Sequence, residues 1–307
     1  MGKGKLKLNA MPVSSLPLED AYICPLSPET KRIAQRELSE EEHTRSLALR
    51  QIREWVASNP SIIRCRTDSN FLLRFLRMKK FRVGDAQQIL ERYLRMRMDH
   101  PSWFRNLDFR DPRMEELIDR GYFFALPERD DAGRRVFFSV AGCLDATRDT
   151  SSDMMKAVQI GLESLIEDEE NQVRGFCYIL DEKNVGFSVV TLWTPSEVSK
   201  AFHCSEKNIP MRHKEIHFVN LPISLYAVFE VAKTMLSDKI RKRFQNKLNS
   251  NLYFKIPTVQ YKKELEEVRG KVLSLDAMEW SKPVKLKKLD KFSVNKLQRS
   301  FKMIEID

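Results

Sequence analysis

The sequence predicts an α/β domain built on a mostly parallel sheet with crossover helices, preceded by a small all-α domain of three helices. Two observations support this prediction. Apolar residues recur at helical spacing between residues 39 and 100, and His100 and Pro101 end this pattern. After Asp111 and Pro112, short apolar runs typical of strands alternate with helical stretches. Such alternation indicates parallel strands joined by crossover helices.

The helical domain is expected over residues 39–105. Ser39 and Glu42 fit a capping box, which predicts the start of its first helix. Two further amphipathic helices are expected over residues 69–80 and 84–99, because apolar side chains gather on one face of each.

The two ends of the chain are expected to lie outside the domains. Residues 1–38 contain prolines and turn signals without helical or strand periodicity, so we expect a flexible N-terminal arm, at most loosely docked. Residues 276–307 carry many lysines and are expected to form a basic C-terminal tail that is exposed or wraps the domain.

The second domain is placed at residues 112–275. Its strands are expected at residues 122–126, 136–141, 175–180 and 215–220. A turn over residues 130–133 separates the first two strands. Helices are expected at residues 153–168, from Pro195, and after Pro222.

Charge and composition narrow the class of protein. Lysine and arginine number 53 against 43 aspartates and glutamates, a formal net charge of +10 that favours an anionic partner. The longest stretch without a charged residue, 216–229, is shorter than the about 20 residues of a membrane-spanning helix. The basic first residues are not followed by an apolar segment, so we expect no secretory signal. Five scattered cysteines indicate reduced thiols in the cytosol, without a disulfide framework or a Cys-based zinc site.

Enzyme motifs are absent from the sequence. It contains no phosphate-binding loop, no nucleophile elbow and no dinucleotide-binding glycine pattern. His213 and His217 superficially resemble a zinc-protease motif, but a lysine stands where the catalytic glutamate belongs. On a strand these histidines would lie about 13 Å apart, too far to share one metal ion. We therefore expect a protein that is not an enzyme and holds no metal.

An amphipathic helix is expected after Pro222. Its apolar face would consist of Leu225, Val228, Phe229, Val231, Ala232, Met235 and Leu236. Such a helix either packs on the core or closes an apolar cavity as a lid. In the second case, Tyr178 and Leu180 on one strand and Phe218 on its neighbour are candidates to line the cavity together with Leu225, Val228, Phe229, Ala232 and Leu236.

Basic residues stand at both ends of this strand–helix unit. Lys239 and Arg243 are four residues apart and would share a helical face, whereas Arg212 and Lys214 would point the same way from an extended segment. The four side chains either clamp one polyanion or form an ordinary solvated surface.

Several segments together resemble the CRAL-TRIO family of lipid-binding proteins, in the branch of the tocopherol-transfer and retinaldehyde-binding proteins and the clavesins. The segments that carry the resemblance are IPMRHKEIHFVNLP at 209–222, FEVAKTMLSDKIRKR at 229–243, NFLLRFLRMKKF at 70–81, GRRV at 133–136 and SFK at 300–302. The first two are the most specific, and the likeness covers residues 40–270 and the tail.

The resemblance implies an α/β lipid-binding domain with a deep apolar pocket under a mobile helical lid, which matches residues 225–236. It implies one small hydrophobic ligand, such as a tocopherol, a retinoid or another lipid, and no cofactor. It also implies that a phosphoinositide headgroup binds at the basic positions Arg212, Lys214, Lys239 and Arg243.

We therefore expect a monomeric cytoplasmic lipid-transfer protein that visits anionic, phosphoinositide-bearing membranes, endosomes among them. The first alternative is a phosphoinositide-binding adaptor or regulator with a shrunken pocket and no lipid transfer. Nucleic-acid binding is a second alternative, but the sequence has no recognition-helix motif, zinc spacing or aromatic-interleaved basic strand.

Overall fold

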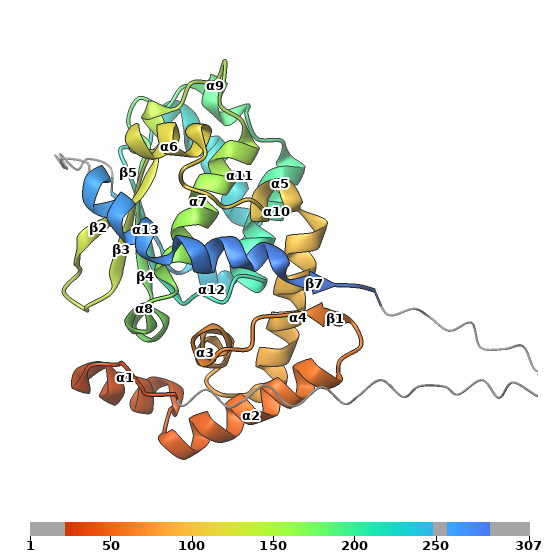
Figure 1. Cartoon of the computed structure of the whole chain (residues 1–307). Helices are drawn as coiled ribbons and strands as arrows, with labels where there is room; N and C mark the ends of the chain where they lie inside the picture. Colours follow the sequence, from red (N-terminus) through yellow and green to blue (C-terminus); the bar gives the residue numbers. More distant parts are fainter. Residues whose placement is uncertain (1–21, 248–256, 283–307) are drawn as a thin grey trace, which may run out of the picture.

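The computed structural model describes residues 22–247 and 257–282, and Figure 1 shows the order of its elements. An N-terminal group of helices lies below an α/β domain in this view. Within the described residues, every helix is too short or too polar to cross a membrane.

Helix α1 (Pro28–Leu38) corrects the expectation of an arm that extends to residue 38. Ser27 caps its first turn, and Ala34 and Leu38 are buried in the core. The rest of the expected arm, residues 1–21, lies outside the described residues. The capping box is also wrong, because Ser39 has a φ of 59° and forms the left-handed C-cap of α1.

The three helices expected in the N-terminal domain are present. They are α2 (Glu42–Ser58), α3 (Ser69–Met78) and α4 (Val83–Asp99). The domain is not purely helical, however, because β1 (Ile62–Arg64) pairs antiparallel with β7 (Glu279–Trp280). The start of the expected tail is therefore anchored in the fold, with Trp280 buried, whereas residues 283–307 lie outside the described part of the chain.

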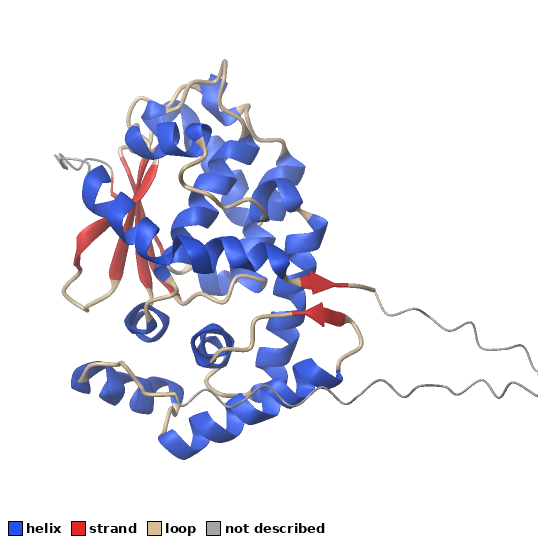
Figure 2. Ribbon diagram, viewed as in Figure 1, coloured by secondary structure: helices blue, strands red, loops and turns tan. Residues whose placement is uncertain are grey.

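The five-stranded sheet has the order β2-β3-β4-β5-β6, with strands β3 to β6 parallel and β2 antiparallel to β3. Its strands are β2 (Phe123–Arg129), β3 (Arg135–Val140), β4 (Phe176–Asp181), β5 (His213–Val219) and β6 (Phe244–Lys247). The mostly parallel sheet and its crossover helices confirm the α/β prediction, and Figure 2 shows the strands gathered on one side of the domain.

The sequence-predicted helices of this domain are α7 (Ser151–Leu165), α10 (Pro195–Lys207) and α11 (Tyr226–Thr234). Thr194 and Glu197 form a capping box at the start of α10, and Pro195 occupies its first turn. The other elements are α5 (Pro101–Phe104), α6 (Pro112–Asp119), α8 (Glu169–Arg174), α9 (Phe187–Val190), α12 (Asp238–Arg241), α13 (Thr258–Ser274) and the 3-10 turns η1 (Ala141–Cys143), η2 (Ile223–Leu225) and η3 (Leu275–Ala277).

Helices α7 and α13 pack against each other and against β2. Gly161 of α7 makes this contact close, because a Cβ at this position would lie 2.5 Å from the Tyr261 hydroxyl and 3.1 Å from Phe123. Phe123, Phe137 and Phe176 stack on the same face of the sheet. Helix α7 packs on this aromatic layer at Gly161.

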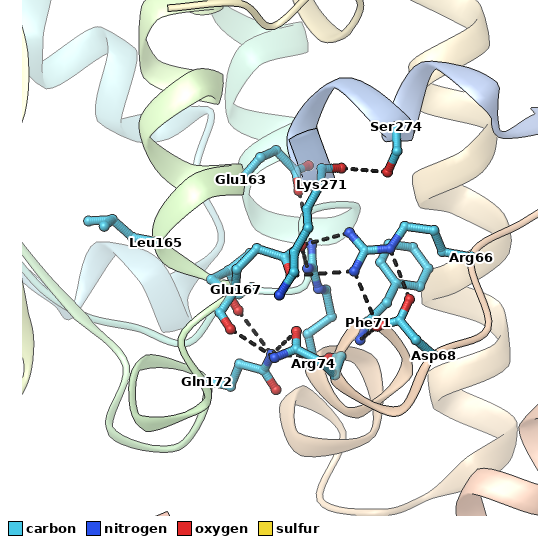
Figure 3. Close-up of polar contacts among 12 residues, drawn as sticks. Arg66, Asp68, Phe71, Arg74, Glu163, Leu165, Glu167, Gln172, Lys271 and Ser274 are labelled. Carbon is cyan, nitrogen blue, oxygen red and sulfur yellow. Dashed lines mark hydrogen bonds and ion pairs between the residues drawn. The ribbon is translucent and has the colours of Figure 1, made fainter. Parts of the chain in front are cut away.

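A buried ion-pair network joins the N-terminal helices to α7 and the loop that follows it (Figure 3). Arg74 of α3 donates to Glu163 at 3.0 Å and to Glu167 at 2.6 Å, and Arg66 also pairs with Glu167, at 2.7 Å. Tyr93 of α4 donates to Glu163 at 2.7 Å. Because buried charges are costly unless they are paired, this network fixes the relative placement of the two domains.

Candidate functional site

A cavity of about 700 Å³ lies between the sheet and helices α10 and α11. Most of its lining is apolar. The lining includes all eight residues that were candidates from the sequence: Tyr178, Leu180, Phe218, Leu225, Val228, Phe229, Ala232 and Leu236.

Strand geometry explains why the floor residues point into the cavity. Side chains alternate between the two faces of a strand, so Tyr178 and Leu180 of β4 share a face. The β4–β5 register pairs Leu180 with Phe218, and Ile216 lines the cavity from the same face of β5. Phe229 of α11 packs edge-on against Phe218 at 4.5 Å between ring centroids.

Helix α11 covers the cavity rather than the core. It has no fully buried residue, whereas Leu225 before it and Leu236 after it are both buried. Val228, Val231 and Met235 line the cavity and are also 40%, 62% and 41% exposed. An apolar helix face with this exposure differs from the buried face of a core helix.

His213 is an uncharged polar group in the cavity wall. It lies 2.8 Å from the Tyr178 hydroxyl through Nδ1 and 3.0 Å from the Ser205 carbonyl oxygen through Nε2. Burial lowers the pKa of His213 to about 4. Neutral histidine satisfies both contacts if Tyr178 donates to Nδ1 and Nε2 donates to Ser205, so this histidine closes a hydrogen-bond chain.

The four basic residues singled out from the sequence stand next to the cavity. Arg243 donates to the backbone oxygen of His213, and Lys239 precedes Ile240, which lines the cavity. Burial and then the charge of Arg212 lower the pKa values of both Lys214 and Arg243, which shows that these three cations converge.

Lys239 and Arg243 do not share a helical face, contrary to the prediction. Helix α12 ends at Arg241, and Arg243 lies in the turn before β6. The approach of Arg243 to Arg212 therefore comes from the β5–β6 pairing, in which Ile216 donates to the Arg243 carbonyl oxygen at 3.0 Å.

Lys79, at the C-terminal end of α3, is a fifth cation of this cluster that was missed in the sequence. Burial lowers its pKa, and the charges of Arg92 and Lys239 act in the same direction. Nothing in the local pattern of residues 69–80 marks Lys79, because its proximity to Lys239 depends on how the two domains dock. We call Lys79, Arg212, Lys214, Lys239 and Arg243 the basic cluster.

An acidic residue from α1 reaches the basic cluster. The Glu37 carboxylate lies 2.8 Å from Arg212 and 3.2 Å from Lys214. Burial opposes ionisation of Glu37, but the hydrogen bond from Arg212 and the charge of Lys214 hold its pKa below the usual value.

Cys177, Glu215 and His217 bring potential metal ligands within 4.8 Å of one another on the opposite face of β4 and β5. Their hydrogen bonds explain this proximity, because His217 lies 3.1 Å from Glu215, which also accepts from Arg134 at 2.8 Å. Burial raises the pKa of the Cys177 thiol to about 11. The cluster thus contains a protonated thiol and a carboxylate that is already paired with an arginine. Because a metal ion needs deprotonated and available ligands, this arrangement does not favour metal binding.

Comparison with known proteins agrees with this geometry. Residues 119–266 match the family model "CRAL/TRIO domain", and residues 40–114 match "Pinta-like, UBA domain". Clavesin-1 of Pongo abelii is 36% identical over 228 residues, 73% of this chain and 64% of that protein. Clavesin-2 of Homo sapiens is 35% identical over 228 residues, 73% of this chain and 70% of that protein.

The chain belongs to the CRAL/TRIO family. The matched region covers less than two thirds of the length of Clavesin-1 and slightly more than two thirds of the length of Clavesin-2. A structure titled "Crystal structure of Sfh5" aligns over 68% of this chain and 81% of that one, with a TM-score of 0.48 and 14% identity. The assignment to the CRAL/TRIO family rests on the family model and the clavesin relatives.

Proposed function

We propose that this CRAL/TRIO protein binds one small hydrophobic lipid in the cavity and transfers it between membranes. The observation that carries the proposal is the apolar cavity of about 700 Å³ under the partly exposed helix α11. Removing apolar surface from water contributes about 25 cal/mol per Å², so such a cavity favours a hydrophobic ligand. The same cavity counts against an adaptor with a shrunken pocket.

The basic cluster would bind the headgroup of a phosphoinositide on the target membrane. Five cations from four segments converge beside the cavity, and compact phosphates carry the charge density that such a cluster suits. The net charge of +10 would add a general attraction to anionic membranes, at about 1 kcal/mol per basic side chain near the surface. The protein would therefore be cytoplasmic, with transient stays on membranes such as endosomes.

Extraction of the purified protein with organic solvent, followed by mass spectrometry, tests lipid binding. We expect a stoichiometric hydrophobic molecule that is absent from extracts of an unrelated basic protein prepared in parallel. A cavity that is empty after purification and takes up no added lipid would contradict the proposal.

Vesicle sedimentation tests the headgroup site. Lys79→Ala combined with Lys239→Ala should remove the preference for phosphatidylinositol bisphosphate vesicles over phosphatidylserine vesicles of equal charge. Neither lysine forms an ion pair with another described residue, so the fold should tolerate the change. The control is Arg50→Ala with Lys263→Ala, which removes two exposed charges elsewhere. If both double variants show the same preference for phosphatidylinositol bisphosphate vesicles, binding depends only on the total charge of the protein.

A further inference from the structure

The cavity has a polar end where β2 begins and β3 and β4 end. Tyr122, Ser139 and Glu182 all line the cavity there. The sheet register brings them together, because Ser139 of β3 pairs with Leu180 of β4 on one side and with Phe123, the neighbour of Tyr122, on the other. Glu182 follows two residues after Leu180, which places the two side chains on the same face.

Backbone pairing holds Glu182 on this face. Its amide donates to the Val219 carbonyl oxygen at 3.0 Å and so continues the β4–β5 ladder beyond the last residue of β4. Burial, and then the charge of Glu182, raises the pKa of the Tyr122 hydroxyl, so the two groups interact electrostatically. Both side chains line the same end of the cavity.

These three side chains have hydrogen-bonding capacity that the described part of the chain does not use. None of them makes a side-chain hydrogen bond or an ion pair with another described residue. Tyr122 and Ser139 are each only 7% exposed. Glu182 is half-buried. Buried polar groups in native proteins nearly always have partners, so polar side chains that line one end of a cavity without a partner among the described residues indicate that a ligand supplies one.

Several other polar groups along the cavity already have protein partners. Glu206 accepts from the Ser237 amide at 3.2 Å, and Thr191 donates to the Ser188 carbonyl oxygen at 2.8 Å. His213 is satisfied by its contacts to Tyr178 and Ser205. The polar end thus differs from the rest of the lining.

The raised pKa of Glu182 limits which chemical group of a ligand can bind at the polar end. Burial, and to a lesser extent the neighbouring Asp181, raises the pKa of Glu182 to about 7. A protonated carboxyl both donates and accepts a hydrogen bond, as does the Ser139 hydroxyl. A hydroxyl on the ligand can match either role, whereas a ligand carboxylate would place a second negative charge in an apolar cavity beside Glu182.

We propose that Tyr122, Ser139 and Glu182 bind the head of the cavity ligand, and that this ligand is an apolar molecule carrying an uncharged hydroxyl group. Fatty acids, with an ionised head, are disfavoured. The inference rests on the proposed function, because it assigns the chemical class of the lipid that the cavity takes.

The test uses delipidated full-length protein and three radiolabelled probes of equal chain length: hexadecan-1-ol, hexadecanoic acid and hexadecane. Each probe partitions from phosphatidylcholine vesicles into the protein at pH 7.5. Wild-type protein should take up the alcohol about tenfold better than the acid or the alkane, the size expected for a buried hydrogen bond. Glu182→Leu should abolish the preference of the alcohol over the alkane.

Glu54→Leu is the matched control, because Glu54 is exposed on α2, does not line the cavity and makes no side-chain hydrogen bond or ion pair with the described residues. It should leave the ratio of alcohol to alkane unchanged. If Glu182→Leu fails to fold, Tyr122→Phe and Ser139→Ala, which delete single hydroxyl groups, should each lower the ratio about threefold.

The outcomes separate the two proposals. Uptake of none of the probes by folded wild-type protein overturns the proposed function, and this inference with it. Uptake of all three with similar affinity, unchanged in the Glu182, Tyr122 and Ser139 variants, overturns the hydroxyl assignment alone. A preference for hexadecanoic acid would also overturn it.

Discussion

The carboxylate of Glu37 on helix α1 lies 2.8 Å from the guanidinium of Arg212 and 3.2 Å from the ammonium of Lys214. Helix α1 is held near the sheet by Thr30, which donates to Glu170 of α8. An anion of the protein itself therefore occupies part of the basic cluster. A membrane phosphate that binds the same two cations has to compete with Glu37.

Glu37→Gln should consequently tighten binding to phosphatidylinositol bisphosphate vesicles. Exposed ion pairs contribute about 0.5 to 1 kcal/mol, so we expect a two- to fivefold lower Kd. Vesicle sedimentation at constant ionic strength measures the change. Glu54→Gln serves as control, because Glu54 is exposed on α2 and makes no side-chain hydrogen bond or ion pair with the described residues. Equal tightening in both variants would mean that net charge, and not competition at Arg212 and Lys214, determines binding.

Local periodicity was sufficient to predict the elements that carry the cavity. Helix α3 and strands β4 and β5 could be predicted because their apolar residues follow the helical or strand period. The cavity-lining candidates followed from the same periods, since Tyr178, Leu180 and Phe218 project from one face of the sheet.

Features created by tertiary contacts could not be predicted in this way. Helix α1 has a polar sequence, and its burial depends on α8, which is distant along the chain. Strands β1 and β7 are very short, and only their pairing identifies them. Helix α13 was missed, and it packs on α7 and β2 with only Tyr261, Leu265 and Val272 fully buried.

The exposed apolar face of α11 should matter for transfer at membranes. Phe229 and Leu236 belong to the apolar face that was predicted from the sequence, but Leu236 is buried and Phe229 packs on Phe218, so charges there would also damage the fold. Val231 is 62% exposed and lines the cavity, which makes Val231→Asp the cleaner change. Losing the burial of one valine in the membrane costs about 1.5 kcal/mol, or about tenfold in transfer rate.

Fluorescent-lipid transfer between vesicles measures this rate, and equilibrium lipid affinity should change much less. Ala227→Asp introduces the same charge on α11 at an exposed position that does not line the cavity, and it should transfer lipid at nearly the wild-type rate. A wild-type rate in Val231→Asp would argue that α11 stays closed and does not enter the membrane.

The buried network should contribute strongly to stability. Arg74→Met removes the cation that pairs with Glu163 and Glu167 and leaves two buried carboxylates with fewer partners. Breaking a buried pair by removing one partner costs about 3 to 5 kcal/mol of unfolding free energy. Urea denaturation measures the loss, and Arg110→Met, which breaks an exposed pair with Glu266, should cost less than about 1 kcal/mol. Similar losses in the two variants would show that burial adds nothing to the pair.

The pH dependence of stability should report the carboxyl at the polar end of the cavity. Burial raises the pKa of Glu182 to about 7 in the folded protein, above the value of 4.5 for an ordinary glutamate. The folded protein therefore binds the Glu182 proton more tightly than the unfolded chain does. The resulting contribution to the free energy of unfolding is complete below pH 4.5 and is lost as pH rises through 7. Glu182→Gln lacks the ionisation and should not show this loss.

The difference in unfolding free energy between Glu182→Gln and the delipidated wild type should thus be larger at pH 8 than at pH 5. One pKa unit corresponds to about 1.4 kcal/mol of unfolding free energy. Because solvent in the cavity screens Glu182, we expect the difference between the two proteins to change by only about 1 to 2 kcal/mol from pH 5 to pH 8. His213 acts in the opposite sense, because its pKa of about 4 makes stability fall as pH drops below 6.5. Both proteins contain His213, so its contribution cancels in the difference. A difference that is constant from pH 5 to pH 8 would mean that Glu182 titrates like an exposed glutamate, and that the polar end of the cavity is open to water.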